Sequence, residues 1–161
     1  MADMLVNLAA LPNLAPVLAE QERKGVKIRR GQPNERDKIV EWVREHINPA
    51  WVIGCETALE QEPSTCYIAV AANDAQVQYS NDLQPESIIG FACFDVVTNG
   101  VFGPTGVLEE RQDGGIDTAL LLTCLHEMAT LNYKQAVIGW TAFIDRSSQA
   151  SWSDNPQDGG R

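Results

Sequence analysis

The sequence predicts an α/β domain with a mixed, mostly antiparallel central sheet flanked by helices and an extra helix near the N-terminus. Two apolar, β-branched runs, 65–72 and 88–97, are typical of central strands. A long helical segment, 116–131, precedes another strand-like run, 135–140, and a helix between strands indicates a parallel crossover. The composition, 44% hydrophobic and 21% charged in 161 residues, is that of one globular domain.

Helices and one strand make up the first part of the chain. Residues 14–24 predict a helix that Gly25 ends, since glycine favours the position after a helix. Residues 26–30 alternate apolar and basic side chains, as a strand with one buried face does. Residues 34–47 place apolar side chains at helical spacing, and residues 50–61 predict a second helix.

The second part begins as a meander of strands. A polar connection, 73–87, separates the first two strands, and Thr98-Asn-Gly100 predicts a hairpin turn into a third strand, 101–107. Gly103-Pro104 lies inside this third strand, and such a pair predicts a bend or bulge there.

The order of elements divides the chain into three parts. These are an N-terminal helical extension (1–25), a main domain (26–146) and a polar, flexible tail (147–161). Trp152 is a lone large aromatic residue in this tail, and such residues often anchor a contact with another protein.

The chain is acidic, with a formal net charge of −10. A protein that binds nucleic acid presents a basic face, so we expect neither nucleic acid nor an anionic membrane as a partner. No apolar run approaches the roughly 18 residues of a membrane span, and the N-terminal residues lack the basic start of a secretory signal. We therefore expect a cytoplasmic protein.

The cysteines do not predict a metal site. Each lies in an apolar stretch, and no two form a CxxC pair. Zinc sites usually have several closely spaced ligands, and neither His46 nor His126 belongs to a group of three or more cysteines and histidines close together in the sequence. We expect buried, reduced thiols at Cys55, Cys66, Cys93 and Cys124.

The segment 103–122, GPTGVLEERQDGGIDTALLL, together with the order of elements, resembles the GNAT superfamily of N-acetyltransferases. The likeness covers residues 26 to about 145 and is most specific at this strand–loop–helix unit. In that family a Gln/Arg-x-x-Gly-x-Gly/Ala loop opens a helix, and its backbone N–H groups bind the pyrophosphate of acetyl-CoA. The resemblance implies acetyl-CoA as the cofactor of an active enzyme, which transfers the acetyl group directly to an amine.

The family motif can be matched to this chain position by position. Gln112 takes the first place and Gly115 the next, whereas Asp117 stands where Gly or Ala belongs. The backbone around Val107 would meet the acetyl group. The resemblance implies a cofactor site made of Val107, Gln112, Gly114, Gly115, Ile116 and Asp117.

The charges of this loop oppose a phosphate. Residues 109–117 carry four carboxylates against Arg111 alone. A carboxylate about 5 Å from a phosphate costs on the order of 1–3 kcal/mol when partly desolvated. Asp117 would lie in the first helical turn, where a carboxylate caps the helix itself. The loop is therefore interpreted as a degraded acetyl-CoA site.

The catalytic groups are also incomplete. The family often uses a tyrosine to protonate the leaving thiolate, and its position is Ile144 here. Tyr133 is interpreted as a helix-end residue packed on the sheet. Trp140, where the family often has a small residue, would narrow the pantetheine channel. Glu56 is a candidate general base acting through water, with a solvated helix glutamate as the alternative.

Two functions remain open from the sequence. The first is a non-catalytic or weakly active protein-binding domain, which would contact its partner through the acidic surface or the tail with Trp152; a homodimer is also compatible. The second is an active acetyl-CoA-dependent N-acetyltransferase of a small amine or a protein amine. Gln112, Gly114 and Gly115 favour the second, since backbone N–H groups bind phosphate whatever the side chains.

Overall fold

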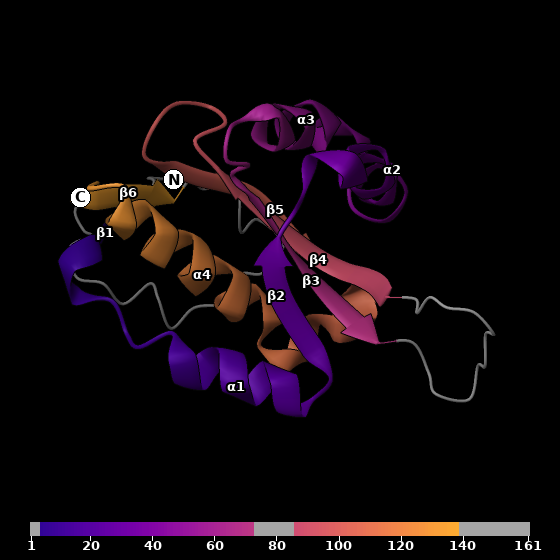
Figure 1. The fold of residues 1–161 in the computed structure, drawn as a ribbon, viewed down its shortest axis with the longest axis horizontal. Helices are drawn as coiled ribbons and strands as arrows, with labels where there is room; N and C mark the ends of the chain where they lie inside the picture. The colour runs from indigo at the N-terminus through magenta and orange to yellow at the C-terminus, as the bar shows by residue number, and fades with distance from the viewer. Residues whose placement is uncertain (1–3, 73–85, 139–161) are drawn as a thin grey trace.

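The computed structural model describes residues 4–72 and 86–138, and its central feature is a six-stranded sheet (Figure 1). Its strands are β1 (Met4–Asn7), β2 (Val26–Arg30), β3 (Cys66–Ala72), β4 (Glu86–Phe94), β5 (Val101–Val107) and β6 (Gln135–Ile138). They lie in the order β1-β6-β5-β4-β3-β2, and only β5 and β6 are parallel neighbours. The mixed, mostly antiparallel sheet predicted from the sequence is confirmed.

Four α-helices accompany the sheet in the described residues: α1 (Ala15–Arg23), α2 (Arg36–His46), α3 (Val52–Glu60) and α4 (Ile116–Thr130). Short 3-10 turns, Pro33–Glu35 and Pro49–Trp51, precede α2 and α3, so the predicted helices 34–47 and 50–61 begin in that form. None of the described helices has the length and apolar character that crossing a membrane requires. Predictions for 73–85 and 139–161 lie outside the described residues.

Strand β1 was not predicted from the sequence. Met4–Asn7 pairs antiparallel with β6, placing Met4 opposite Ile138, and Leu8 N–H donates to the carbonyl of Lys134 at 3.0 Å. The segment expected to be a helical extension thus also adds a strand at the edge of the sheet. The strand has four residues, of which only Val6 is buried. Such a short segment cannot show the alternation of apolar and polar residues by which a strand is recognised in a sequence.

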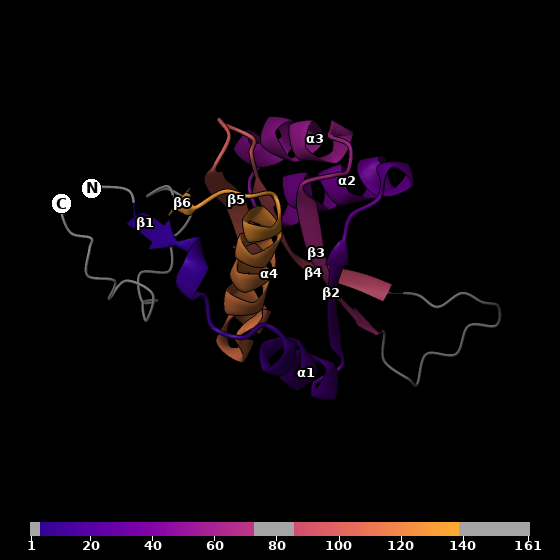
Figure 2. The same ribbon diagram turned by 60° about the vertical axis from the view of Figure 1, so that its left-hand side comes forward.

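Helices cover both faces of the sheet (Figure 2): α2 and α3 lie on one face, and α4 and α1 lie on the other. Helix α4 lies between the sheet and the N-terminal segment, and it buries Ile116, Ala119, Leu120, Leu121, Leu122, Cys124, Leu125 and Met128. Its enclosure on most sides explains why its apolar residues exceed one stripe.

Phe91 of β4 joins the α2–α3 pair to the sheet. Its side chain is fully buried, and its ring lies 6.2 Å from that of Trp42 in an edge-on arrangement and 6.5 Å from that of Trp51. Gly106 of β5 permits the end of α2 to approach closely, since a Cβ there would lie 2.8 Å from Ile47 Cγ2. This packing fixes α2 and α3 over strands β4 and β5.

Arg30, at the end of β2, ties three segments together. Its guanidinium donates to the carbonyl of Ser64 at 2.6 Å and pairs with Glu127 of α4 at 3.2 Å. It also lies 5.0 Å from the ring centre of Tyr67, within range of a cation–π contact. Burial raises the pKa of Tyr67 to about 12, so its hydroxyl stays protonated beside this network.

The neighbouring Arg29 holds the turn that leads into α2. Its guanidinium makes two hydrogen bonds with the carboxylate of Glu35, at 2.9 and 2.8 Å, and the same carboxylate accepts from Gln32 N–H at 3.0 Å. The hydrogen bond with Arg29 lowers the pKa of Glu35 from its ordinary value of 4.5. Arg29 and Arg30 therefore both have structural partners.

Candidate functional site

The strand–loop–helix unit after β5 brings the predicted cofactor residues together. β5 ends at Val107, a 3-10 turn spans Glu109–Gly114, and α4 begins at Ile116. Gly115 links turn and helix with φ 81°, a left-handed conformation that glycine adopts without strain. The side-chain amide of Gln112 folds back and donates to the carbonyl of Val107 at 3.1 Å.

Asp117 uses its carboxylate at the start of its own helix. The first hydrogen bond that closes a turn of α4 runs from Ala119 N–H to the carbonyl of Gly115, at 3.0 Å. The N–H groups before this first helical hydrogen bond are the groups with which a helix N-terminus can bind an anion. One of them, Thr118 N–H, donates to Asp117 Oδ1 at 2.9 Å. A side chain of the protein thus occupies a donor in the turn that would face a phosphate.

Helix α1 packs against this loop, and this contact was not predicted from the sequence. Gln21 Nε2 and Lys24 Nζ both donate to the carbonyl of Gly114, at 2.8 and 3.1 Å. Gln21 is buried, and its Oε1 has no hydrogen-bond partner among the described residues. Lys24 also lies 3.8 Å from Glu20, so its charge is shared between a carboxylate and the loop.

Lys24 adds a positive charge to the loop after β5. Arg111 is the only cation within residues 109–117, but the fold places a second one, Lys24, against the loop from about 90 positions away. The sequence carries no signal for this contact, because α1 lies outside the matched segment. The acidic character of the loop is therefore weaker than its own residues indicate.

The two adjacent glycines of the loop are expected to differ in how much their replacement by alanine destabilises the protein. Gly115→Ala should lower the free energy of unfolding by about 1–2 kcal/mol, since a left-handed φ strains a residue with a Cβ. A Cβ there would also lie 3.3 Å from Gln21 Nε2. Gly114→Ala should change it by less than about 0.5 kcal/mol, because no described atom lies within 4 Å of its Cβ. Urea denaturation of both variants measures the difference; equal losses would contradict this account.

Comparison with known proteins was made against family models, curated proteins and solved structures. No protein-family model matches the sequence, and no curated protein matches it. Two solved structures resemble the fold. One is a GCN5-related glucosamine N-acetyltransferase region of a fungal multi-domain GH3 β-N-acetylglucosaminidase, with TM-score 0.63. The other is the C-terminal DUF2156 domain of a protein from Agrobacterium fabrum assigned as a lysylphosphatidylglycerol synthetase, with TM-score 0.51. The fold is GNAT-like.

The likeness is one of fold and not of sequence. The first neighbour is 11% identical, and the match covers 90% of this chain and 19% of that one. The second is 12% identical, with 86% and 46% covered. The chain therefore spans less than half the length of either neighbour. At this identity the chemistry of the neighbours does not transfer, and the site must be judged from its own residues.

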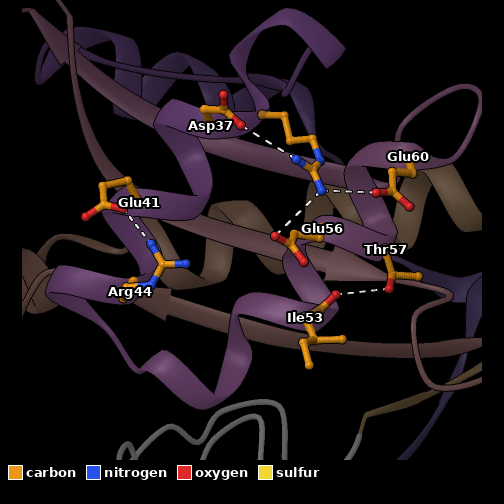
Figure 3. A network of polar contacts seen from close by, with 8 residues as sticks. Asp37, Glu41, Arg44, Ile53, Glu56, Thr57 and Glu60 are labelled. Carbon is orange, nitrogen blue, oxygen red and sulfur yellow. Dashed lines mark hydrogen bonds and ion pairs between the residues drawn. The ribbon is translucent and has the colours of Figure 1, made fainter.

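In this GNAT-like fold, Glu56 belongs to a surface network of charges between α2 and α3 (Figure 3). Its carboxylate lies 3.6 Å from the guanidinium of Arg36, which also pairs with Glu60 at 3.2 Å and Asp37 at 3.6 Å. The structure places Glu56 against α2, and no ion pair or hydrogen bond of Glu56 reaches the loop after β5 within the described residues. Its role as a general base stays a prediction.

Tyr133, which follows α4, contacts the residue after the end of β4. Its hydroxyl donates to Asp95 Oδ2 at 3.0 Å, and burial together with this carboxylate raises the pKa of Tyr133. Its ring packs against the apolar core on the α4 face. These contacts match the packed, helix-end tyrosine expected from the sequence. The remaining candidates lie outside the described residues: Trp140, Ile144 and Trp152.

The four cysteines are buried, as expected, but three of them converge. The Sγ atoms of Cys55, Cys66 and Cys93 all lie within 4.8 Å of one another, from α3, β3 and β4. Cys124 lies on the opposite face of the sheet, where its thiol is 4.0 Å from the carbonyl of Ala92. Spacing along the sequence could not reveal this cluster, since its members come from three separate elements.

Proposed function

We propose that this chain is a GNAT-fold protein with a degraded acetyl-CoA site, which acts as a non-catalytic or weakly active protein-binding domain. The observation that supports this most directly is the 2.9 Å hydrogen bond from Thr118 N–H to Asp117 Oδ1. In a working loop the N–H groups of this turn bind the pyrophosphate. Here a carboxylate of the same helix takes one of them and adds a negative charge where the phosphates would lie.

Electrostatics set the size of this effect. A fixed carboxylate near a partly desolvated phosphate costs on the order of 1–3 kcal/mol, which corresponds to a loss of affinity of about 5- to 150-fold. Glu109, Glu110 and Asp113 add further negative charge around the turn. Lys24 offsets only part of it, because Glu20 shares its ammonium group.

A protein partner fits the character of the surface. The net charge of −10 favours a partner with basic residues, which the acidic field would attract. Four large apolar side chains are exposed in the described residues, and the two most exposed, Ile53 on α3 at 74% and Val97 after β4 at 77%, would offer such a partner apolar contact area.

The alternative, an active acetyl-CoA-dependent N-acetyltransferase of a small or protein amine, has specific support. Gly114 and Gly115 leave the backbone of the loop accessible, and Lys24 supplies a cation that the sequence did not place there. Backbone N–H groups bind phosphate independently of side chains. The two functions differ in whether acetyl-CoA binds the natural chain tightly.

Calorimetric titration of acetyl-CoA into the natural chain and into Asp117→Asn distinguishes them. Asparagine keeps the oxygen that accepts from Thr118 N–H but removes the charge. We expect weak or undetectable binding to the natural chain and about tenfold tighter binding to Asp117→Asn. The matched control is Asp113→Asn, which removes the same charge from an exposed position of the preceding turn and should change affinity by less than about threefold.

Micromolar binding of acetyl-CoA to the natural chain, with transfer of the acetyl group to an amine, would contradict the proposal and establish the alternative. An equal gain in both variants would show that net charge, and not the position of Asp117, weakens the site.

A further inference from the structure

Three cysteine side chains meet in the core between the sheet and the α2–α3 pair. Cys66 and Cys93 are direct register partners on β3 and β4, and Cys55 lies over them on α3. Phe94 N–H donates to the carbonyl of Thr65 at 3.1 Å, so Phe94 and Thr65 form a hydrogen-bonded pair. In an antiparallel ladder the two pair types alternate, so the next pair, Cys66 and Cys93, is a non-hydrogen-bonded pair. Side chains of such pairs lie especially close.

Core packing alone does not require this convergence. Cys124 shows that a single thiol suffices to fill a small apolar gap on the other face of the sheet. The other three cysteines place their Sγ atoms within 4.8 Å of one another, although they come from a helix and two strands. Each of the three side chains is fully buried, at 0% exposure. The cluster is therefore a closed arrangement of three sulfur ligands.

We propose that Cys55, Cys66 and Cys93 form a closed three-thiolate site for a soft, thiophilic metal ion of the Cu(I) class. A metal–sulfur bond of about 2.3 Å in a trigonal arrangement places the sulfurs about 4 Å apart. The observed spacing of up to 4.8 Å needs only a small contraction. Thiolates select soft ions over hard ones, which prefer oxygen ligands.

The number of ligands favours a three-coordinate ion. No histidine or carboxylate among the described residues joins the three thiols within ligand distance of them. A structural zinc site almost always has four protein ligands, so three buried thiolates suit Cu(I) better than Zn²⁺. Apolar side chains of the same core cluster include Ile39, Leu59 and Ile68. All three thiols are fully buried, so none of them contacts solvent.

Protons must leave the site when the ion binds. Hydrogen bonds from the Cys66 and Cys93 thiols favour Cys55 as a thiolate and lower its pKa, with Arg36 adding a smaller attraction. The pKa of Cys93 is raised by burial, and that of Cys66 is raised chiefly by its interaction with Cys55. Cysteine binds a metal ion as the thiolate, so binding releases thiol protons and the affinity for the ion should fall at lower pH.

The test is competition for Cu(I) between the full, reduced chain and a chromophoric Cu(I) chelator under anaerobic conditions. Because the site is closed, the chain is also refolded from urea with Cu(I) present, which gives the ion access during folding. We expect one equivalent to leave the chelator and the loaded chain to melt at a higher temperature. With Cd²⁺ as a spectroscopic probe, thiolate charge-transfer absorption should saturate at one equivalent.

Matched variants locate the site. Cys93→Ala and Cys66→Ala each remove one ligand and should weaken Cu(I) binding by at least about 100-fold, since even losing an outer-shell partner costs about 10- to 100-fold. Cys124→Ala removes an equally buried thiol outside the cluster and should bind as the natural chain does. Circular dichroism confirms that each variant is folded before its affinity is compared.

Failure of the reduced natural chain to retain one equivalent, after refolding with Cu(I), overturns the proposal without any variant. A Cys66–Cys93 disulfide found by mass spectrometry in protein purified without reductant, together with no copper uptake after reduction, also overturns it. Equal loss of binding in Cys124→Ala would show that the ion is not held by this cluster.

Discussion

Phe91→Ala is expected to lower the free energy of unfolding by about 3–5 kcal/mol, the range for removing a fully buried aromatic side chain. The loss combines the transfer of the ring from water with the cavity left between β4 and the α2–α3 pair. The ring also supports two tryptophans, Trp42 and Trp51, which would lose their aromatic contact. Few other single changes would remove so much of this core.

Urea denaturation followed by tryptophan fluorescence and by circular dichroism measures this loss. The two probes separate detachment of α2 and α3 from global unfolding, because Trp42 and Trp51 report on that layer. Val97→Ala is the control: its side chain is 77% exposed, and the expected change is below about 0.5 kcal/mol. A loss under about 1 kcal/mol for Phe91→Ala would show that this packing does not hold the layers together.

Arg30→Ala should lower the free energy of unfolding by about 2–3 kcal/mol. The guanidinium is about a quarter exposed, so its contacts with the carbonyl of Ser64 and with Glu127 are only partly screened by water. Without it, Glu127 on α4 lacks its ion-pair partner, and β2 loses a link to the segment before β3. The contact with the Tyr67 ring is lost as well.

Arg30→Lys gives a sharper test of the geometry. Lysine keeps the charge but lacks the planar fork that reaches Ser64 and Glu127 together, so it should recover about half of the loss. Arg23→Ala serves as the control, since Arg23 also has an ion-pair partner but is mostly exposed, and should cost less than about 0.5 kcal/mol. Chemical denaturation at pH 7 gives all three values; full recovery with lysine would mean that charge alone matters.

The sequence predicted the long or strongly apolar elements well. Strands β3 and β4 are mainly apolar runs, and α4 carries many apolar residues over four turns. Both kinds of pattern are long enough to identify the type of element. Strand β1 was missed because four residues, one of them buried, carry almost no pattern. It exists through its pairing with β6, which is a tertiary interaction.

The candidate site likewise includes residues that could be named from the sequence and residues that could not. The six residues between Val107 and Asp117 could be named from the sequence because they lie within one recognisable strand–loop–helix unit, and their role as a cofactor site stays a prediction. Lys24 and the cysteine cluster could not be named in this way, since their contacts join residues far apart along the chain. Spacing within a sequence reports on local structure, whereas these groups meet only after the sheet has formed.

The pairing of β1 with β6 also has a consequence during synthesis. Asn7 and Gln135 are register partners, so about 130 residues must be translated before β1 finds its place. At about 5–20 residues per second, that interval lasts roughly 7–26 s. During this time the Met4–Asn7 segment has no strand partner in the growing chain, and unpaired strand edges are prone to association. Slowing or pausing the ribosome beyond β5 should therefore lengthen the period in which the nascent chain depends on a chaperone.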